Sequence, residues 1–179
     1  MIVFEGPDGA GKTTLLKHIA KQYNLKIAPR VVGTDTQPMV DLREWVEDNL
    51  ARDRYNMNTI FDRHRLISEP IYSVAMGGER DDRFWDLHWL KRSMDKFYDC
   101  EPFIVWCLPP YDVVVRNCED DSNEFVRPFT KKIYRGYLAE MARWAGMPQG
   151  WQLTYDYHNH DLGDFMAEFD TLYDLWRDR

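Results

Sequence analysis

The chain has 179 residues, of which 44% are hydrophobic and 15% aromatic, so it is long and apolar enough to fold as one globular domain spanning 1–179. Its net charge of −7 and pI near 5.2 disfavour broad electrostatic binding to nucleic acid, which draws most of its affinity from phosphate neutralisation. No run of about 18 apolar residues is present and the first apolar run begins at Ile2, so neither a membrane span nor a signal peptide is expected. The three cysteines are scattered without metal-type spacing, which predicts reduced thiols in a cytoplasmic protein.

Apolar patterning predicts an alternation of strands and helices along the chain. In order, it indicates a strand at 2–4, a helix at about 12–23, a short strand at 25–28, a polar loop at 33–38, a helix at 40–54 and a strand at 58–62. Next come a long, partly helical connection at 63–82 interrupted by Pro70, an amphipathic helix at 83–98, an apolar strand at 102–108, a helix beginning at 111–117 and an acidic loop at 119–124. A helix at 125–144 with Pro128 in its first turn, a strand at 151–156 and a helix at 165–177 complete the chain.

The first turn carries the most specific motif. Gly6-Pro-Asp-Gly-Ala-Gly-Lys-Thr13 matches the P-loop spacing G-x-x-x-x-G-K-[ST] and stands between a predicted strand and a predicted helix. In such a loop the glycines let backbone N–H groups face phosphate oxygens, while Lys12 would reach the β- and γ-phosphates and the Thr13 hydroxyl would hold Mg²⁺. The motif therefore predicts an ATP·Mg²⁺ site with contacts from Gly6, Asp8, Gly9, Ala10, Gly11, Lys12, Thr13 and Thr14. It also predicts a P-loop NTPase fold of three α/β/α layers with a mostly parallel five-stranded sheet.

A second charged motif, Asp62-Arg63-His64, ends the strand predicted at 58–62. Ligands of parallel sheets bind at the carboxyl ends of the strands, so this motif should face the same crevice as the P-loop. Asp62 could position Mg²⁺ or deprotonate an acceptor, and the planar fork of Arg63 could clamp a phosphate.

Together, Glu5-Gly-Pro-Asp-Gly-Ala-Gly-Lys-Thr-Thr14 and Asp62-Arg-His64 resemble the thymidylate kinases among the nucleoside monophosphate kinases. In that family the P-loop commonly has the pattern E-G-x-D/E-G-x-G-K-T, and the third strand ends in D-R-Y/H. The segments 62–72, 104–116 and 125–137 are similar to later elements of the family, so the resemblance covers most of the chain.

The resemblance implies roles for individual residues. Asp8 would contact the 3′-hydroxyl of an acceptor deoxyribose, and Arg63 would hold the acceptor phosphate. Arg116 and Arg127, on a lid at about 116–128, would neutralise the transferring phosphoryl group, and the loop at 156–160 would border adenine. The expected activity is phosphoryl transfer from ATP to a small-molecule deoxynucleoside monophosphate similar to dTMP.

One departure from the family leaves other acceptors open. Only 50 residues (62 − 12) separate Lys12 from Asp62, fewer than in thymidylate kinases, and the missing region usually supplies an aromatic residue and an arginine to the acceptor base. Arg52-Asp-Arg54-Tyr55 offers those residue types without fixing their placement. A deoxynucleoside is therefore an alternative acceptor, and the sequence does not determine the oligomeric state.

A hydroxymethyl-pyrimidine within DNA, the acceptor of some compact viral P-loop kinases, is a further alternative. Its path could be lined by arginines and tryptophans at 30, 43, 45, 63, 65, 80, 83, 85 and 89. A P-loop switch acting on a protein partner is the rival from another class. Against it, no Asp-x-x-Gly element follows a strand outside the P-loop itself, and the chain has no Asn-Lys-x-Asp motif.

Overall fold

A computed structural model describes residues 1–28, 42–53, 58–77, 86–120, 124–147 and 150–178. Its strands are β1 (Ile2–Glu5), β2 (Lys26–Ile27), β3 (Thr59–Asp62), β4 (Phe103–Cys107) and β5 (Trp151–Tyr155). Its α-helices are α1 (Lys12–Gln22), α2 (Leu42–Asp53), α3 (Arg65–Met76), α4 (Leu87–Asp99), α5 (Tyr111–Asp120), α6 (Thr130–Ala145) and α7 (Leu162–Arg177), with a short 3₁₀ helix η1 (Arg127–Phe129) before α6.

The strands form one five-stranded sheet in the order β2-β3-β1-β4-β5, and every pairing is parallel. The predicted α/β fold is thus confirmed. β1 pairs on one side with β3, opposing Phe4 to Asp62, and on the other side with β4, opposing Glu5 to Trp106. This register places the carboxyl ends of β1, β3 and β4 together, where the P-loop and Asp62 lie.

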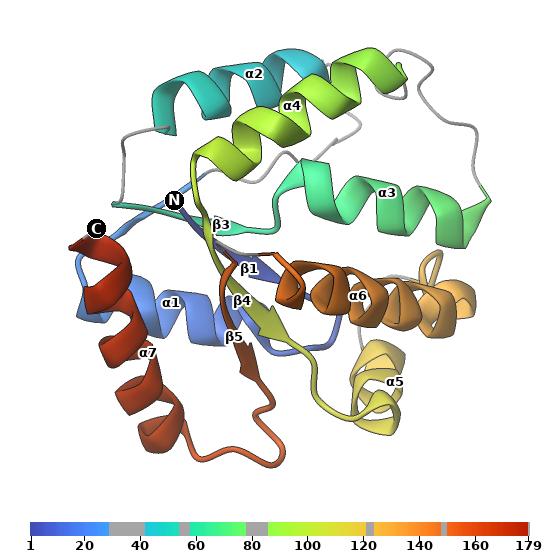
Figure 1. The fold of residues 1–179 in the computed structure, drawn as a ribbon. Coiled ribbons are helices and arrows are strands. Elements are labelled where there is room, and N and C mark those ends of the chain that lie inside the picture. Colours follow the sequence, from blue (N-terminus) through green and yellow to red (C-terminus); the bar gives the residue numbers. More distant parts are fainter. Residues whose placement is uncertain (29–41, 54–57, 78–85, 121–123, 148–149, 179) are drawn as a thin grey trace.

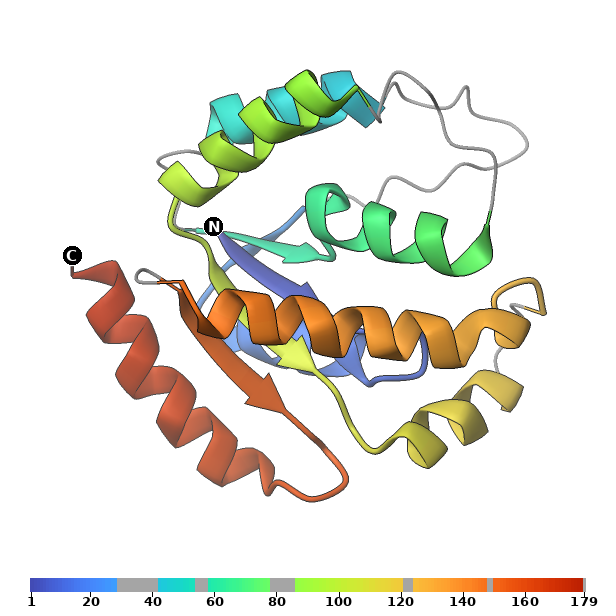
Figure 2. The same ribbon diagram turned by 45° about the vertical axis from the view of Figure 1, so that its right-hand side comes forward.

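Alternating strand residues enter two separate hydrophobic cores, as expected for a sheet covered on both faces. Met1 and Val3 pack in one core with residues of α2, α3, α4 and α6, whereas Ile2 and Phe4 pack in the other with residues of α1 and α7. The two sets of helices are seen on opposite sides of the sheet in Figures 1 and 2. The three-layer arrangement follows directly from this period-two pattern.

Neighbouring strands β1 and β3 lead to helices on opposite faces, because β1 continues into α1 and β3 into α3. A crevice between two such connections is the usual ligand site of an open parallel sheet. The order of the strands therefore makes the space between the P-loop and the Asp62-Arg63 turn the candidate binding site.

Some element boundaries differ from the predicted ones for local reasons. Pro70 lies inside α3, where the apolar face formed by Leu66, Ile67 and Ala75 stabilises the helix despite the lost hydrogen bond. α5 continues to Asp120, so the first two residues of the predicted acidic loop are helical. Pro128 is the second residue of the 3₁₀ helix η1, which begins at Arg127, and the α-helix starts only at Thr130.

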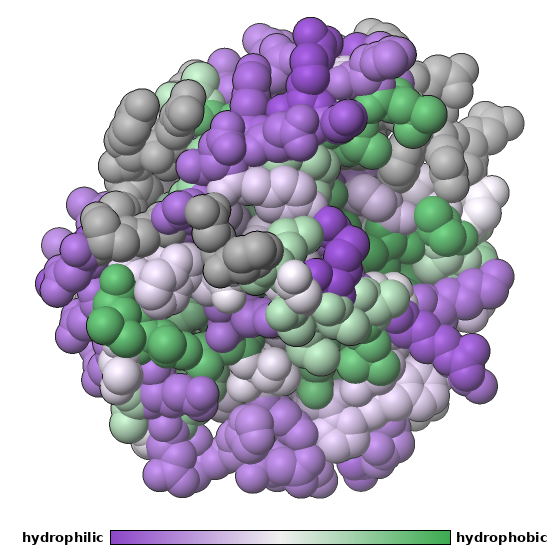
Figure 3. Space-filling model, viewed as in Figure 1, coloured by the Kyte–Doolittle hydropathy of each residue, from purple (hydrophilic) through white to green (hydrophobic). Residues whose placement is uncertain are grey.

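Two helix starts are set by aspartate caps. α4 begins at Leu87, after Asp86 accepts hydrogen bonds from the amides of His88 and Trp89, and α7 begins at Leu162 behind the cap Asp161. The predicted polar loop at 33–38 lies outside the described residues, as do the arginines at 30, 80 and 83 that were suggested for a DNA path. Hydrophilic residues cover much of the face in Figure 3, with apolar residues in scattered groups. None of the helices in the described ranges is long and apolar enough to cross a membrane.

Candidate active site

The P-loop is held in shape by backbone that only glycine accommodates. Gly6 has φ +146°, and a Cβ there would stand 2.2 Å from the carbonyl oxygen of Cys107 in the neighbouring strand β4. Gly11 has φ +76°, and a Cβ there would stand 2.9 Å from the ring of Tyr157. The loop therefore curls tightly between β4 and the segment after β5 before α1 begins at Lys12.

Lys12 is the first residue of α1, so its ammonium lies at the positive end of a helix dipole. Its side chain is buried, and Nζ donates to the carbonyl of Pro7 across the loop. Burial, followed by the positive charge of Arg63, lowers the pKa of Lys12 to about 8. Triphosphate oxygens at the same place would oppose both effects, and the ammonium and the amides of this loop suit such an anion.

Thr13 and Asp62 meet although they are far apart in sequence. The Thr13 hydroxyl donates to Asp62 Oδ2 at 3.0 Å, which joins the start of α1 to the end of β3. Mg²⁺ in nucleotide sites commonly takes one or two protein oxygens, with phosphates and water as the remaining ligands. This pair fits that role, and within the described ranges no group of three or more His, Cys, Asp or Glu side chains is placed to hold a metal.

Arg63 is directed at the P-loop from the other side of the crevice. Its Nε donates to the carbonyl of Gly6 at 3.2 Å, and its terminal nitrogen pairs with Asp8 Oδ1 at 2.6 Å. The guanidinium carbon lies 5.0 Å from the ring centroid of Tyr72, whose hydroxyl donates to Asp8 Oδ2 at 3.0 Å. Asp8, Arg63 and Tyr72 thus form a connected triad at the mouth of the P-loop.

The electrostatics of the triad keep its charges in place. Burial by itself would raise the pKa of Asp8, but the charges of Arg63 and Lys12 outweigh it, so the pKa lies below the ordinary value of 3.8. Asp8 is therefore ionised at neutral pH and remains a hydrogen-bond acceptor on both oxygens. Burial also raises the pKa of the Tyr72 hydroxyl, which consequently stays protonated and donates.

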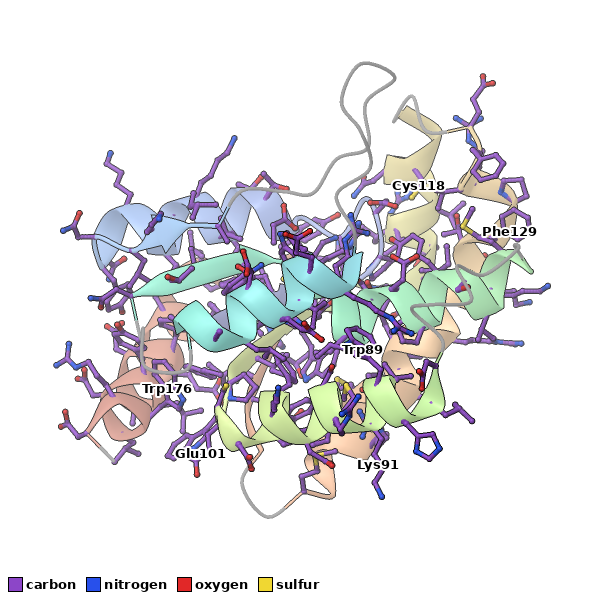
Figure 4. All side chains as sticks on the ribbon, turned by 90° about the horizontal axis from the view of Figure 1, so that it is seen from above. Trp89, Lys91, Glu101, Cys118, Phe129 and Trp176 are labelled. Atoms are coloured by element: carbon purple, nitrogen blue, oxygen red, sulfur yellow. The ribbon has the colours of Figure 1, made fainter. Side chains whose placement is uncertain are left out.

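Helix α5 rests on the P-loop, a contact that sequence patterning did not predict. Asn117 Nδ2 donates to the Gly9 carbonyl at 2.7 Å and also to the Tyr157 hydroxyl, while Cys118 Sγ lies 3.2 Å from the Asp8 carbonyl. Cys118 is seen on α5 in Figure 4. The contacts span 108 and 110 residues of sequence, and no local motif marks Asn117 or Cys118.

A cavity of about 520 Å³ opens beside the P-loop, and Arg63 is not among the residues that line it. Gly11, Leu15, His18, Asn117, Tyr157 and Leu162 contribute to its lining. Its apolar and aromatic walls and its position next to Gly11 suit a nucleobase attached to a phosphate chain in the loop. Tyr157 belongs to the predicted base-bordering segment 156–160, where His158 and His160 take part in hydrogen bonds around Asp156.

The described contacts of the two arginines assigned to a lid are with residues outside the triad. Arg116 is 65% exposed on α5 and pairs with Asp112 at 3.5 Å, and Arg127 donates to the Cys118 carbonyl at 3.5 Å. Residues 121–123 between them are outside the described ranges, as are Arg54 and Tyr55 of the candidate base-reading segment. A catalytic role for Arg116 and Arg127 stays a prediction.

Three residues suggested for a DNA path, Arg43, Arg65 and Trp89, contact other side chains of the protein. Arg43 lies over the ring of Trp89 at 5.0 Å and 3.8 Å from Asp86, and Arg65 pairs with Glu69 at 3.1 Å. Trp89 is 4% exposed and its indole donates to Glu47, so it is a core residue on α4 (Figure 4). Trp85 is outside the described residues.

The chain is similar in structure to solved nucleotide-binding proteins, at low sequence identity. The YorR protein of Bacillus subtilis, crystallised with phosphorylated GDP, superposes with a TM-score of 0.67 and 15% identity over 99% of this chain and 98% of that one. Deoxyadenosine kinase from M. mycoides with bound dCTP gives a TM-score of 0.57 and 16% identity over 96% of this chain and 100% of that one. No protein-family model and no curated protein sequence matches the chain. The likeness shows that this chain shares the fold of these two proteins.

Proposed function

We propose that this chain is a kinase that transfers the γ-phosphoryl group of ATP·Mg²⁺ to a deoxynucleoside monophosphate. The observation that carries the proposal is the triad of Asp8, Arg63 and Tyr72, which stands at the mouth of a complete P-loop. An ionised carboxylate and a guanidinium held together beside the phosphate loop suit the sugar hydroxyl and the phosphate of a nucleotide acceptor. The fold shared with the deoxyadenosine kinase of M. mycoides supports the same reaction class.

On the donor side, this chain's residues would bind and orient the phosphates. Lys12 and the first amides of α1 would meet the phosphate oxygens, and Thr13 with Asp62 would hold the Mg²⁺ that shields the developing charge. Phosphoryl transfer needs mainly such positioning and cationic stabilisation, since its transition state spreads charge over the equatorial oxygens.

On the acceptor side, Asp8 would bind the sugar and Arg63 would bind the phosphate. Asp8 is ionised and can accept a hydrogen bond from a ribose hydroxyl. The planar fork of Arg63 matches a phosphate in two-point geometry, and the ring of Tyr72 supports its outer face. When the acceptor binds, the phosphate would take the place of Asp8 on the terminal nitrogen of Arg63.

A deoxynucleoside acceptor is the second candidate, favoured by the 2.6 Å pair of Arg63 with Asp8. That pair already neutralises the guanidinium, so an uncharged acceptor could bind without breaking it. The M. mycoides enzyme, a deoxyadenosine kinase solved with dCMP as a product, has the same fold.

The test is ADP release from ATP with a panel of acceptors: the four common deoxynucleoside monophosphates, the corresponding deoxynucleosides, and DNA containing hydroxymethyluracil. The proposal expects stimulation by at least one free monophosphate. Stimulation by deoxynucleosides alone supports the second candidate, and stimulation by DNA alone supports the polymer acceptor. Turnover that no acceptor increases overturns the kinase proposal.

The substitution Arg63→Ala tests whether Arg63 binds the acceptor. Loss of the guanidinium should raise the KM for the acceptor about tenfold or more, equivalent to about 1.4 kcal/mol, and leave the KM for ATP within about twofold. Arg65→Ala is the matched control, because Arg65 pairs with Glu69 on α3 and should change neither constant. Equal rises in both constants for Arg63→Ala would remove Arg63 from the acceptor site.

A further inference from the structure

Glu5 is a buried carboxyl group for which the proposed chemistry has no use. It ends β1 immediately before the P-loop and has no exposed surface. Its Oε1 accepts a hydrogen bond of 2.6 Å from the backbone amide of His64, which lies 59 residues further along the chain. Burying a carboxyl group is costly unless its hydrogen bonds repay the lost solvation, so this position calls for an explanation.

The amide that Glu5 holds belongs to the turn that carries Arg63. Arg63 has φ +71°, a left-handed conformation that strains the backbone of any residue other than glycine. The Arg63 amide donates to the Phe4 carbonyl at 2.9 Å, so two consecutive amides of the turn are bound to the end of β1. These two bonds oppose relaxation of the turn to an ordinary conformation.

The same turn determines where the guanidinium points. From its left-handed backbone, Arg63 reaches the Gly6 carbonyl and Asp8, which lie one and three residues after Glu5 in the P-loop. Glu5 thus joins the backbone of the acceptor turn to the strand that begins the phosphate loop. Any shift of His64 away from Glu5 would move Arg63 relative to Asp8.

The surroundings of Glu5 favour a neutral carboxyl group in this role. Burial raises the pKa of Glu5 to about 8, against the opposing effects of the His64 amide and the charge of Arg63. The hydroxyl of Tyr137, a fully buried residue of α6, lies beside the carboxyl group, and the Tyr137 ring meets the Tyr72 ring edge-on at 6.3 Å. A glutamine here would keep both the shape and the accepting oxygen.

We propose that Glu5 is a positioning residue for the acceptor: its carboxyl oxygen holds the His64 amide and thereby fixes Arg63 in the turn from which it meets the acceptor. This inference rests on the proposed function. It differs from a purely structural role, in which Glu5 would satisfy a buried amide and affect stability only.

The experiment compares Glu5→Gln, which keeps an accepting oxygen, with Glu5→Met, which has a similar volume and no such oxygen. Steady-state constants are measured with the acceptor identified for the wild-type enzyme, together with the melting temperature of each variant. Glu5→Gln should leave both KM values within about twofold. Glu5→Met should raise the acceptor KM about tenfold with the ATP KM unchanged. A tenfold change corresponds to a loss of about 1.4 kcal/mol of acceptor binding free energy when Arg63 is misplaced.

A double-mutant cycle with Arg63→Ala separates positioning from stability. In the Arg63→Ala background, Glu5→Met should change the acceptor KM less than twofold while still lowering the melting temperature. A tenfold rise of the acceptor KM in both backgrounds would overturn the inference, as would a loss of acceptor binding in Glu5→Gln.

If Glu5→Met does not fold, Glu5→Asp replaces it, since the shorter side chain draws the oxygen back from His64. Glu5→Asp should raise the acceptor KM with the ATP KM unchanged, and an unchanged acceptor KM would overturn the inference. A wild-type enzyme without acceptor-dependent turnover would overturn the proposed function, and this inference with it. If the wild-type enzyme shows acceptor-dependent turnover but Glu5→Met raises the acceptor KM equally with and without Arg63, the inference alone is overturned.

Discussion

Replacing Glu5 by glutamine should change how the stability of the protein depends on pH. The Glu5 carboxyl group is completely buried at the end of β1, and burial raises its pKa from the ordinary 4.5 to about 8. Glutamine has nearly the same volume and the same accepting oxygen for the His64 amide, and it does not titrate. The difference between the two stability curves therefore isolates the ionisation of this one group.

The sign follows from which state holds the proton more tightly. Below pH 4.5 the group is protonated in both the folded and the unfolded state, so the wild-type protein loses no free energy of unfolding through its ionisation. Between pH 4.5 and about 8 the unfolded chain releases the proton and the folded protein retains it, so the wild-type free energy of unfolding falls as the pH rises. At 1.36 kcal/mol per pH unit, the Gln variant should gain about 3 kcal/mol over the wild type between pH 5 and pH 7.5.

The assay is guanidinium chloride unfolding of both proteins at a series of pH values, followed by circular dichroism. The other titratable groups are common to both chains, so their contributions largely cancel in the difference. Parallel curves from pH 5 to pH 8 would refute the reasoning, because they would mean that folded Glu5 is ionised like an ordinary carboxylate. A difference that grows towards acid would require a depressed pKa and would refute it as well.

Three further substitutions test the donor side. Lys12→Met should lower kcat by about 10²–10³-fold with an unchanged circular dichroism spectrum, because one positioned cation is lost and the packing is kept. Gly6→Ala should lower the free energy of unfolding by more than about 2 kcal/mol, since its Cβ would stand 2.2 Å from the Cys107 carbonyl. Gly146→Ala is the control and should be nearly neutral, because the nearest atom to its Cβ would be 3.5 Å away. Tyr157→Ala should raise the KM for ATP about tenfold through lost stacking, and Tyr157→Phe, which keeps the ring, should not; equal effects of both would exclude stacking.

Local features of the sequence were sufficient for the fold and for the phosphate loop. The P-loop is contiguous, so the spacing of Gly6, Gly11 and Lys12 is visible without any tertiary structure. The five strands were predicted from the sequence, and each appears in the sheet. The central strands β1, β3 and β4 are apolar because they are covered on both faces, whereas the edge strand β2 is exposed. Element boundaries were less predictable, since Asp86 and Asp161 act as caps only in a particular backbone geometry.

The meeting of Asp62 with the P-loop was also predictable. Both motifs follow predicted strands, and parallel strands bring their carboxyl ends to one edge of the sheet. The Thr13–Asp62 hydrogen bond is the expected consequence of that rule. The rule specifies an edge of the sheet, but it does not specify which atoms of Arg63 and Asp8 come together.

Contacts between distant segments were decided by the tertiary structure alone. Asn117 reaches the Gly9 carbonyl across 108 residues, and Glu5 reaches the His64 amide across 59, and neither pair has a sequence spacing that marks it. The protonation of Glu5 likewise depends on what buries it, since the same residue type at the surface would titrate near 4.5. The sequence thus determined that a phosphate-binding loop and an acidic-basic turn share one edge of a parallel sheet. Folding decided how they are joined, because burial and long-range hydrogen bonds exist only once the segments have packed.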